Sequence, residues 1–132
     1  MKGRKRNKRG GNVEHAPDIL ALAYRRDGAE VIVEVCGELD LATAPLLERA
    51  LADLIDDQGC RSIVLDLHGL DFIGSTGLSV LLAAKDRAQS RGGEVILARP
   101  SPTARRSIEI SGLLSEFAFR DDSAAATGDP SS

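Results

Sequence analysis

The sequence predicts a single α/β domain with a mixed sheet of four to five strands and three or more helices, mostly on one face of the sheet. Short apolar runs rich in β-branched residues alternate along the chain with longer amphipathic segments, which is the pattern of a layered α/β fold. The 132 residues suffice for one hydrophobic core but not for two. With no Trp, one Tyr and three Phe, that core must be built from aliphatic side chains.

Five apolar runs predict the strands. The first two are separated by Asp27-Gly28 and should form a hairpin, because Asp-Gly favours a tight turn. The third is apolar on both faces apart from Asp66, as expected of a central strand flanked by helices. We expect strands at residues 19–25, 30–37, 62–67 and 94–98, and a short edge strand at 117–119.

Three amphipathic segments predict helices. The first opens within residues 41–45, where Asp40 or Thr43 supplies the cap and Pro45 suits the first turn, and Gln58-Gly59 ends it. The second runs from residue 76 to about 91 and the third from 102 to 111, each followed by glycine. The strands and helices then follow one another in the order β-β-α-β-α-β-α with a short β tail, and we expect right-handed crossovers.

Charge divides the chain into a basic leader and an acidic domain. The first ten residues hold six of the 17 Lys and Arg and none of the 20 Asp and Glu. No aromatic residue interleaves these charges, so we interpret residues 1–16 as a disordered, solubilising leader that binds no nucleic acid. We assign residues 17–120 to the α/β domain and expect a disordered tail over 121–132, which is rich in Ala, Ser, Asp and Gly.

The sequence predicts a cytoplasmic protein without membrane contact. Cys36 and Cys60 lack the CxxC spacing of metal and redox sites, so we interpret them as reduced structural thiols. Gly10-Gly11-Asn12 follows the basic start, where a signal peptide would continue with apolar residues. No apolar run approaches the roughly 20 residues of a membrane span.

Ser75 lies where a strand and loop become a helix, at a predicted N-cap. A hydroxyl there is close to unpaired backbone N–H groups and to the positive end of the helix dipole. A negative charge added at this position is therefore well tolerated, and a phosphate could be accommodated without unfolding the helix.

Little in the sequence supports an enzyme. The string IGSTG around Ser75 fails the GxSxG spacing of a nucleophile elbow, and only His15 and His68 could act as imidazole bases. Asp40, Asp66 and Asp71 could converge as metal ligands at the strand ends, but helix capping and turn formation explain them better. No nucleotide-binding motif follows a strand. We therefore predict no catalytic residue, no metal and no cofactor, and keep an anion or nucleotide sensor at the helix N-terminus as a minor alternative.

Two motifs resemble those of STAS-domain proteins, in particular bacterial anti-sigma factor antagonists. GELDLATAPLLERAL, from Gly37 to Leu51, is similar to the family's exit from the second strand and its first helix. IVLDLHGLDFIGSTGLSVLL, from Ile63 to Leu82, is similar to its central strand, phosphorylation loop and second helix. The resemblance covers about residues 19–119, in the order of elements predicted above.

The resemblance implies a phosphorylation switch in a binding module rather than an enzyme. In the family, the serine that heads the second helix is phosphorylated by the cognate anti-sigma factor, itself a serine kinase, and that position is Ser75. Asp40 matches an acidic residue near the phosphoacceptor. The unmodified protein would bind the anti-sigma factor and release its sigma factor, the phosphate would lower the affinity, and a phosphatase would restore it. The expected partner-binding residues are Asp40, Leu41, Thr43, Ile73, Gly74, Thr76, Gly77 and Leu78.

Gly74 departs from the family pattern, in which the residue before the serine is often Asp. A glycine there makes the loop more flexible and removes a carboxylate beside the phosphoacceptor. This departure motivates an alternative function: an unphosphorylated STAS scaffold, or a subunit of a signalling or lipid-transport complex.

Overall fold

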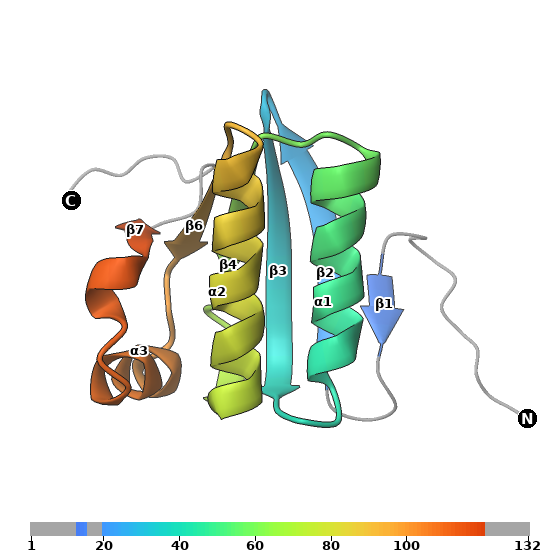
Figure 1. Cartoon of the computed structure of the whole chain (residues 1–132). Coiled ribbons are helices and arrows are strands. Elements are labelled where there is room, and N and C mark those ends of the chain that lie inside the picture. The colour runs from blue at the N-terminus through green and yellow to red at the C-terminus, as the bar shows by residue number, and fades with distance from the viewer. Residues whose placement is uncertain (1–12, 16–19, 121–132) are drawn as a thin grey trace, which may run out of the picture.

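A computed structural model describes residues 13–15 and 20–120, in which strands and helices alternate as predicted (Figure 1). In chain order the elements are β1 (Val13–His15), β2 (Leu20–Asp27), β3 (Glu30–Leu39), α1 (Ala44–Ala52), η1 (Asp53–Asp57), β4 (Ser62–Asp66), β5 (Leu70–Ile73), α2 (Ser75–Ser90), β6 (Glu94–Ala98), α3 (Pro102–Ile110), η2 (Leu114–Glu116) and β7 (Ala118–Arg120).

The sheet is mixed, as predicted, but larger than the four to five strands expected. In the described residues it has seven strands in the order β1-β2-β3-β4-β6-β7, with β5 paired to β3 outside this path. The pairs β1–β2 and β2–β3 are antiparallel and the others are parallel. The hairpin between β2 and β3 turns at Gly28, whose φ of 66° lies in the left-handed region that glycine tolerates.

The two strands that the sequence pattern missed are short. β1 has three residues and falls inside the stretch predicted to be a disordered leader, so that prediction is wrong for Val13–His15. β5 has four residues and was expected to be loop. It forms because β3 is ten residues long: its first half pairs with β4, and its last three residues, from Gly37, pair with β5. The rest of the predicted leader and the predicted tail lie outside the described residues.

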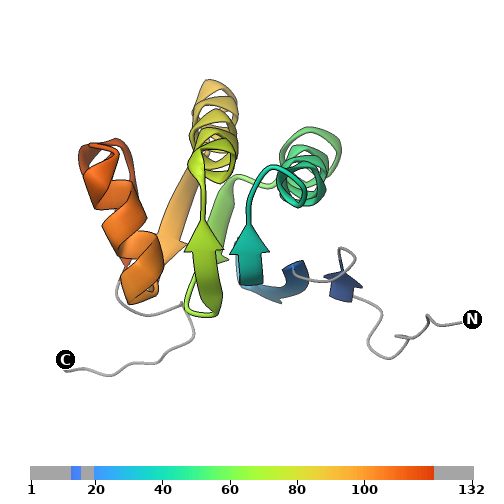
Figure 2. The ribbon, with the colours of Figure 1, turned by 90° about the horizontal axis from the view of Figure 1, so that it is seen from below.

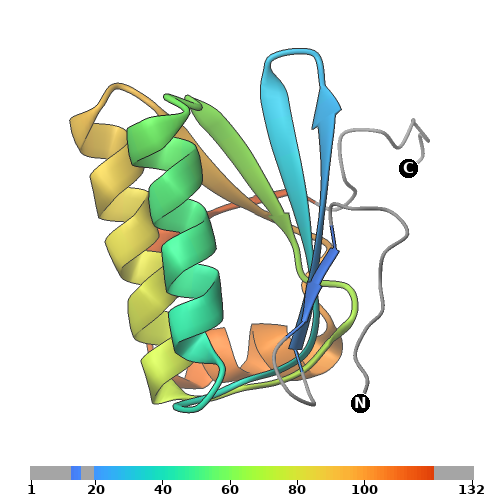
Figure 3. The ribbon, with the colours of Figure 1, turned by 90° about the vertical axis from the view of Figure 1, so that its right-hand side faces the viewer.

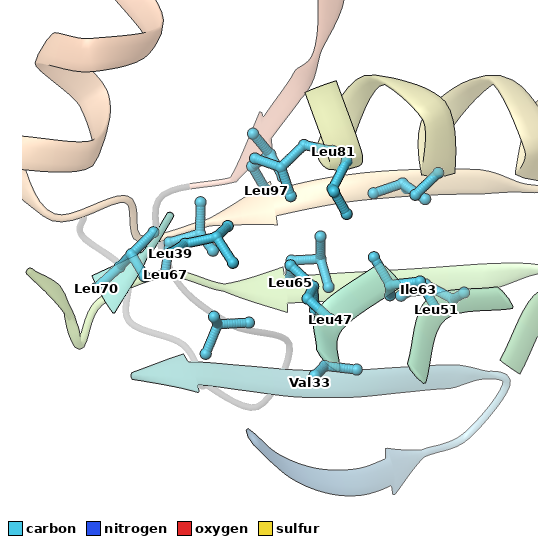
Figure 4. Packing of buried hydrophobic residues seen from close by; sticks show 14 of the residues in the cluster. Val33, Leu39, Leu47, Leu51, Ile63, Leu65, Leu67, Leu70, Leu81 and Leu97 are labelled. Carbon is cyan, nitrogen blue, oxygen red and sulfur yellow. The ribbon is translucent and has the colours of Figure 1, made fainter. Parts of the chain in front are cut away.

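All three α-helices lie on one face of the sheet, which confirms the predicted layering (Figures 2 and 3). The main core fills the space between this face and the helices (Figure 4). Leu47 and Leu51 of α1 and Leu81 of α2 are at most 1% exposed and pack against inward side chains of the strands. The i, i+4 spacing of Leu47 and Leu51 places them on one side of the helix, as the amphipathic pattern predicted.

The last turn of the first helix is a π-helix, η1, before the predicted end at Gln58-Gly59. This turn places Asp56 opposite α2. The Asp56 carboxylate pairs with the Nε of Arg87 and the Nε of Arg91, each at 3.2 Å. The two ion pairs join the end of the first helix to the end of α2 and help to keep the helices side by side.

The outer face of the sheet carries a second, smaller apolar cluster of Ile32, Val64, Ile96 and Ala98. This cluster explains why the central strands carry apolar residues on both faces, although the helices cover only the other face. On this outer face Arg120 of β7 reaches Glu30 of β3 with two hydrogen bonds, at 3.2 and 2.8 Å. These bonds connect the last strand to the middle of the sheet.

The Arg120–Glu30 pair predicts a pH-dependent contribution to stability. The hydrogen bond from Arg120 lowers the pKa of Glu30 below the ordinary value of a glutamate side chain. Because the pKa of Glu30 is lower in the folded protein, the ion pair stabilises the fold fully at pH values above the ordinary pKa of the carboxyl. This contribution fades as the pH falls through the lowered pKa. In urea unfolding, Glu30→Gln should reduce stability at pH 7 by less than about 1 kcal/mol, because the pair is partly exposed. The difference from wild type should vanish in acid.

Glu109→Gln is the matched control, since Glu109 is an exposed carboxylate on α3, outside the Arg120–Glu30 pair. We expect it to leave the pH profile of the unfolding free energy close to that of wild type. A Glu30→Gln profile that runs parallel to wild type down to acid pH would contradict the role of the ion pair.

Candidate functional site

Two chain segments meet at the carboxyl end of β3 and carry most of the predicted site. One is the β3–α1 loop, residues 40–43, and the other is the junction of β5 and α2 at Gly74. β3 and β5 are parallel, so both segments leave the sheet at the same edge, as Figure 2 shows. The N–H of Gly74 donates to the carbonyl of Leu39 at 2.9 Å, which joins the two segments directly.

Asp40 shapes the first segment through hydrogen bonds from its side chain. Its Oδ1 accepts the N–H of Ala42 at 3.0 Å and that of Thr43 at 3.2 Å. In return the Asp40 N–H donates to Oγ1 of Thr43 at 3.0 Å, and this hydroxyl donates to the Glu38 carbonyl at 2.7 Å. Thr43 is the N-cap of α1 by position, but no side chain accepts a helical N–H there, so the predicted capping bond is absent. Asp40 and Thr43 instead close the turn before α1 and set the direction in which the chain enters it.

Gly77 sets how closely α2 approaches β3. A Cβ atom added at Gly77 would lie 2.7 Å from Cγ of Leu39 and 3.0 Å from Cγ1 of Ile73. Both distances are shorter than a carbon–carbon contact allows, so only glycine fits without a shift of the helix. The first turn of α2 thus packs directly on the last residue of β3.

The structure corrects the predicted cap of α2. Gly74, not Ser75, is the N-cap, because the carbonyl of Gly74 accepts the N–H of Leu78 at 3.0 Å and the helix starts one residue earlier than expected. Ser75 is the first helical residue and its side chain is exposed. Its hydroxyl is therefore free of the capping role that the sequence predicted, and it remains available to a partner.

The predicted partner-binding residues divide into an exposed and a buried group. Leu41 is 76% exposed, and Asp40, Gly74 and Thr76 are half-buried. The other four are buried and form the inner support of this face: Thr43, Ile73, Gly77 and Leu78. The sequence analysis named all eight as partner-binding from their place in the motifs, and motif position does not reveal which way a side chain points.

Phe72 is the exposed residue that the sequence analysis left out of the site. It lies on β5, three residues before Ser75, and is 45% exposed. Its neighbours Leu70 and Ile73 are buried. The sequence did contain a signal for an exposed aromatic residue, because Phe72 follows the charged Asp71 in a short segment. Only the pairing of β5 with β3 shows that the ring faces outward.

The candidate metal ligands do not assemble. Asp66 is buried at the end of β4, where it accepts the His68 N–H at 3.0 Å and pairs with Arg99 at 3.0 Å. The Asp40 side chain is bonded within its own turn, and Asp71 is exposed. Within residues 13–15 and 20–120, no group of three or more His, Cys, Asp or Glu is arranged to hold a metal ion. In the same part of the chain Cys36 and Cys60 are free thiols.

A cleft among the described residues lies away from the predicted site. This cleft of about 750 Å³ lies between the first helix and the β2–β3 hairpin, lined by residues such as Tyr24, Leu46 and Arg49. None of the predicted site residues lines it. Small-molecule sites are usually concave, and this cleft is formed by other residues than those of the predicted site.

Comparison with known proteins identifies the family to which this fold belongs. A family model of the STAS domain matches residues 21–126, most of the chain. The chain belongs to the STAS domain family. The segments around Asp40 and Ser75 are thus parts of a STAS domain, and their positions at one edge of the sheet agree with the resemblance seen in the two sequence motifs.

Several relatives of this STAS protein are named anti-sigma factor antagonists. Anti-sigma-F factor antagonist RsfB of Mycobacterium tuberculosis is 32% identical over 102 residues, which cover 77% of this chain and 82% of the relative. An anti-sigma F factor antagonist of Paenibacillus polymyxa is 31% identical over 103 residues, 78% of this chain and 88% of the relative.

The crystal structure of an anti-sigma factor antagonist from Mycobacterium paratuberculosis superimposes with a TM-score of 0.73 at 30% identity. The superposition covers 83% of this chain and 92% of that protein. The predicted fold class is confirmed. Within the described residues no helix is long and apolar enough to cross a lipid bilayer.

The hydrogen bonds of Asp40 predict different results for two substitutions. Asp40→Ala removes the acceptor of the Ala42 and Thr43 N–H groups and should lower the free energy of unfolding by about 1 kcal/mol. Asp40→Asn keeps an acceptor oxygen and should lower the free energy of unfolding by only a few tenths of that amount. Urea denaturation of both variants measures the difference, and equal losses would show that charge, not the turn, is what Asp40 contributes.

The close contact at Gly77 predicts that Gly77→Ala destabilises the protein even though alanine favours a helix by about 1 kcal/mol over glycine. We expect a net loss of about 1–2 kcal/mol in urea, because the new methyl group must push α2 away from Leu39. Ser79→Ala, at an exposed position of the same helix, should change stability by less than about 0.5 kcal/mol. A stabilised Gly77→Ala protein would disprove the tight approach of helix and strand.

Proposed function

We propose that this protein is an anti-sigma factor antagonist that binds an anti-sigma factor with serine kinase activity and is switched off by phosphorylation at Ser75. The observation that carries the proposal is the exposed hydroxyl of Ser75 at the start of α2, beside the segment that holds Asp40 and Leu41. The names of the relatives support the same class of function. The protein would act by binding, with no reaction of its own, in the cytoplasm.

The start of α2 is well suited to accept a phosphate. The first intrahelical bond runs from Leu78 to Gly74, so the N–H groups of residues 75–77 precede it and lack intrahelical acceptors. These groups and the helix dipole favour a negative charge at this end. The fold should therefore tolerate phosphorylation of Ser75.

The same phosphate should weaken binding to a partner. It adds about −1.5 to −2 charges at neutral pH. The segments around Ser75 offer a partner the apolar side chain of Leu41 and the carboxylates of Asp40 and Asp71, and residues 38–43 and 70–78 include no Lys or Arg to neutralise an anion. Enclosing the phosphate in an interface would cost desolvation, so the complex dissociates until a phosphatase removes the group.

Phosphorylation and binding can be tested together with Ser75 variants. A serine-kinase anti-sigma factor from the source organism, with ATP, should add the mass of one phosphate to the wild type and none to Ser75→Ala. Ser75→Asp should bind the same anti-sigma factor at least about tenfold more weakly than wild type, measured by titration calorimetry. Ser79→Ala is the matched control, since Ser79 is also exposed, one helical turn further along α2.

Phosphate incorporated equally into Ser75→Ala would show that another hydroxyl, such as that of Thr76, is the acceptor. Binding of an anti-sigma factor without phosphorylation would favour the scaffold alternative, to which Gly74 in place of Asp already points. A wild-type protein that binds no anti-sigma factor would overturn the proposed function.

A further inference from the structure

We propose that Phe72 is the aromatic anchor through which the anti-sigma factor holds the Ser75 surface, and that Gly74 keeps its ring in position. The partner would offer an apolar pocket for the ring. This inference rests on the proposed function and adds to it the residue that provides the binding energy.

Phe72 differs from the other two phenylalanines of the chain. Phe117 is only 8% exposed, and Phe119 packs against the core and lies 5.1 Å from the guanidinium of Arg105. Phe72 is 45% exposed and belongs to neither apolar cluster. An aromatic ring that the fold leaves half in water has a large apolar area still to bury, and such residues dominate protein interfaces.

The backbone does not require glycine at position 74. Gly74 has φ −96° and ψ −177°, an extended conformation open to any residue. The constraint comes from the ring: a Cβ atom at Gly74 would lie 3.3 Å from Cε2 and 3.6 Å from Cζ of Phe72. The ring of Phe72 therefore lies against the position of a Cβ atom at residue 74, slightly closer than an ordinary contact at one ring atom.

An aspartate at position 74 would change this surface in two ways. Its Cβ would push the ring outward by a few tenths of an ångström or turn it away, which the exposed ring can do at little cost. Its carboxylate would also stand beside the ring and the Ser75 hydroxyl. With glycine, the ring of Phe72 keeps its place beside residue 74 and no charge is added there.

Leu41 places a second apolar group at the same edge. It is 76% exposed and lies two residues after Leu39, whose carbonyl is bonded to Gly74. Phe72 lies two residues before Gly74, so each of the two exposed residues is two positions along the chain from one partner of this hydrogen bond. A kinase that reaches the hydroxyl of Ser75 covers the segments on which these two residues lie, and it meets two exposed apolar side chains there beside the carboxylates of Asp40 and Asp71.

The affinity of single variants tests the anchor. The probe is the purified anti-sigma factor that binds the wild-type protein, titrated without ATP into wild type, Phe72→Ala, Leu41→Ala and Ile110→Ala. Phe72→Ala should raise the Kd at least about tenfold and Leu41→Ala by a smaller factor. Ile110→Ala is the matched control, because Ile110 is 73% exposed but lies on α3, outside both segments. It should leave the Kd unchanged, and all variants should unfold at nearly the wild-type urea concentration.

A fluorescent variant gives a second readout. The chain contains no Trp, so Phe72→Trp creates a single reporter at the proposed anchor. Its emission should shift to shorter wavelength when the partner covers it. Gly74→Asp should raise the Kd in the wild-type background and have a smaller effect when residue 72 is already Ala, because the two residues act through the same ring.

The outcomes separate this inference from the proposed function. If the wild type binds an anti-sigma factor and Phe72→Ala binds it equally well, Phe72 is no anchor although the proposed function stands. Equal weakening by Ile110→Ala, or an emission of the Phe72→Trp variant that stays unchanged in the complex, would likewise overturn the anchor. If the wild type binds no anti-sigma factor, both proposals fall.

Discussion

The contact between the first turn of α2 and the end of β3 is the constraint on which the candidate site depends. Gly77 allows the helix to rest on Leu39, and the N–H of Gly74 donates to the carbonyl of the same leucine. Leu39 is thus held in two ways: its side chain packs against Gly77 and its carbonyl accepts the N–H of Gly74. Because the β3–α1 loop starts at the following residue, this contact brings Asp40 and Leu41 close to the start of α2.

The rest of the fold supports this contact from both sides. β3 is long enough to pair with β4 along its first half and with β5 at its end. The pairing with β5 sets where Gly74 lies relative to the end of β3. The buried Asp66 ties down the turn that precedes β5 by accepting the N–H of His68. Ser101, the cap of α3, donates to the carbonyl of Leu70 at 2.6 Å and so holds β5 from the other side. A hydroxyl group at residue 75 is therefore presented by rigid elements, as recognition by an enzyme or partner requires.

Burial decides which members of the predicted surface can meet a partner. Ile73 and Leu78 stand next to the phosphoacceptor motif in the sequence, yet they are 3% and 6% exposed and fill the core beneath it. Phe72, which no motif singled out, is exposed because it pairs with the exposed Glu38 just after an irregularity in the β3–β5 register, where strict alternation of the side chains is lost. In a short strand the alternation of side chains is too brief to be recognised from the sequence, so strand pairing must supply the orientation.

The sequence alone determined the fold class, the order of the main elements, the hairpin at Gly28, the one-sided helical layer and the position of Ser75 at a helix start. These follow from local periodicity and from turn residues, which act over a few neighbours along the chain. Only the tertiary structure decided that Gly74 caps α2, that β5 pairs with β3, and that Leu41 and Phe72 are exposed while Thr43 is buried. Those features depend on contacts between segments far apart in the sequence, such as Leu39 with Gly74, and no local pattern encodes such contacts.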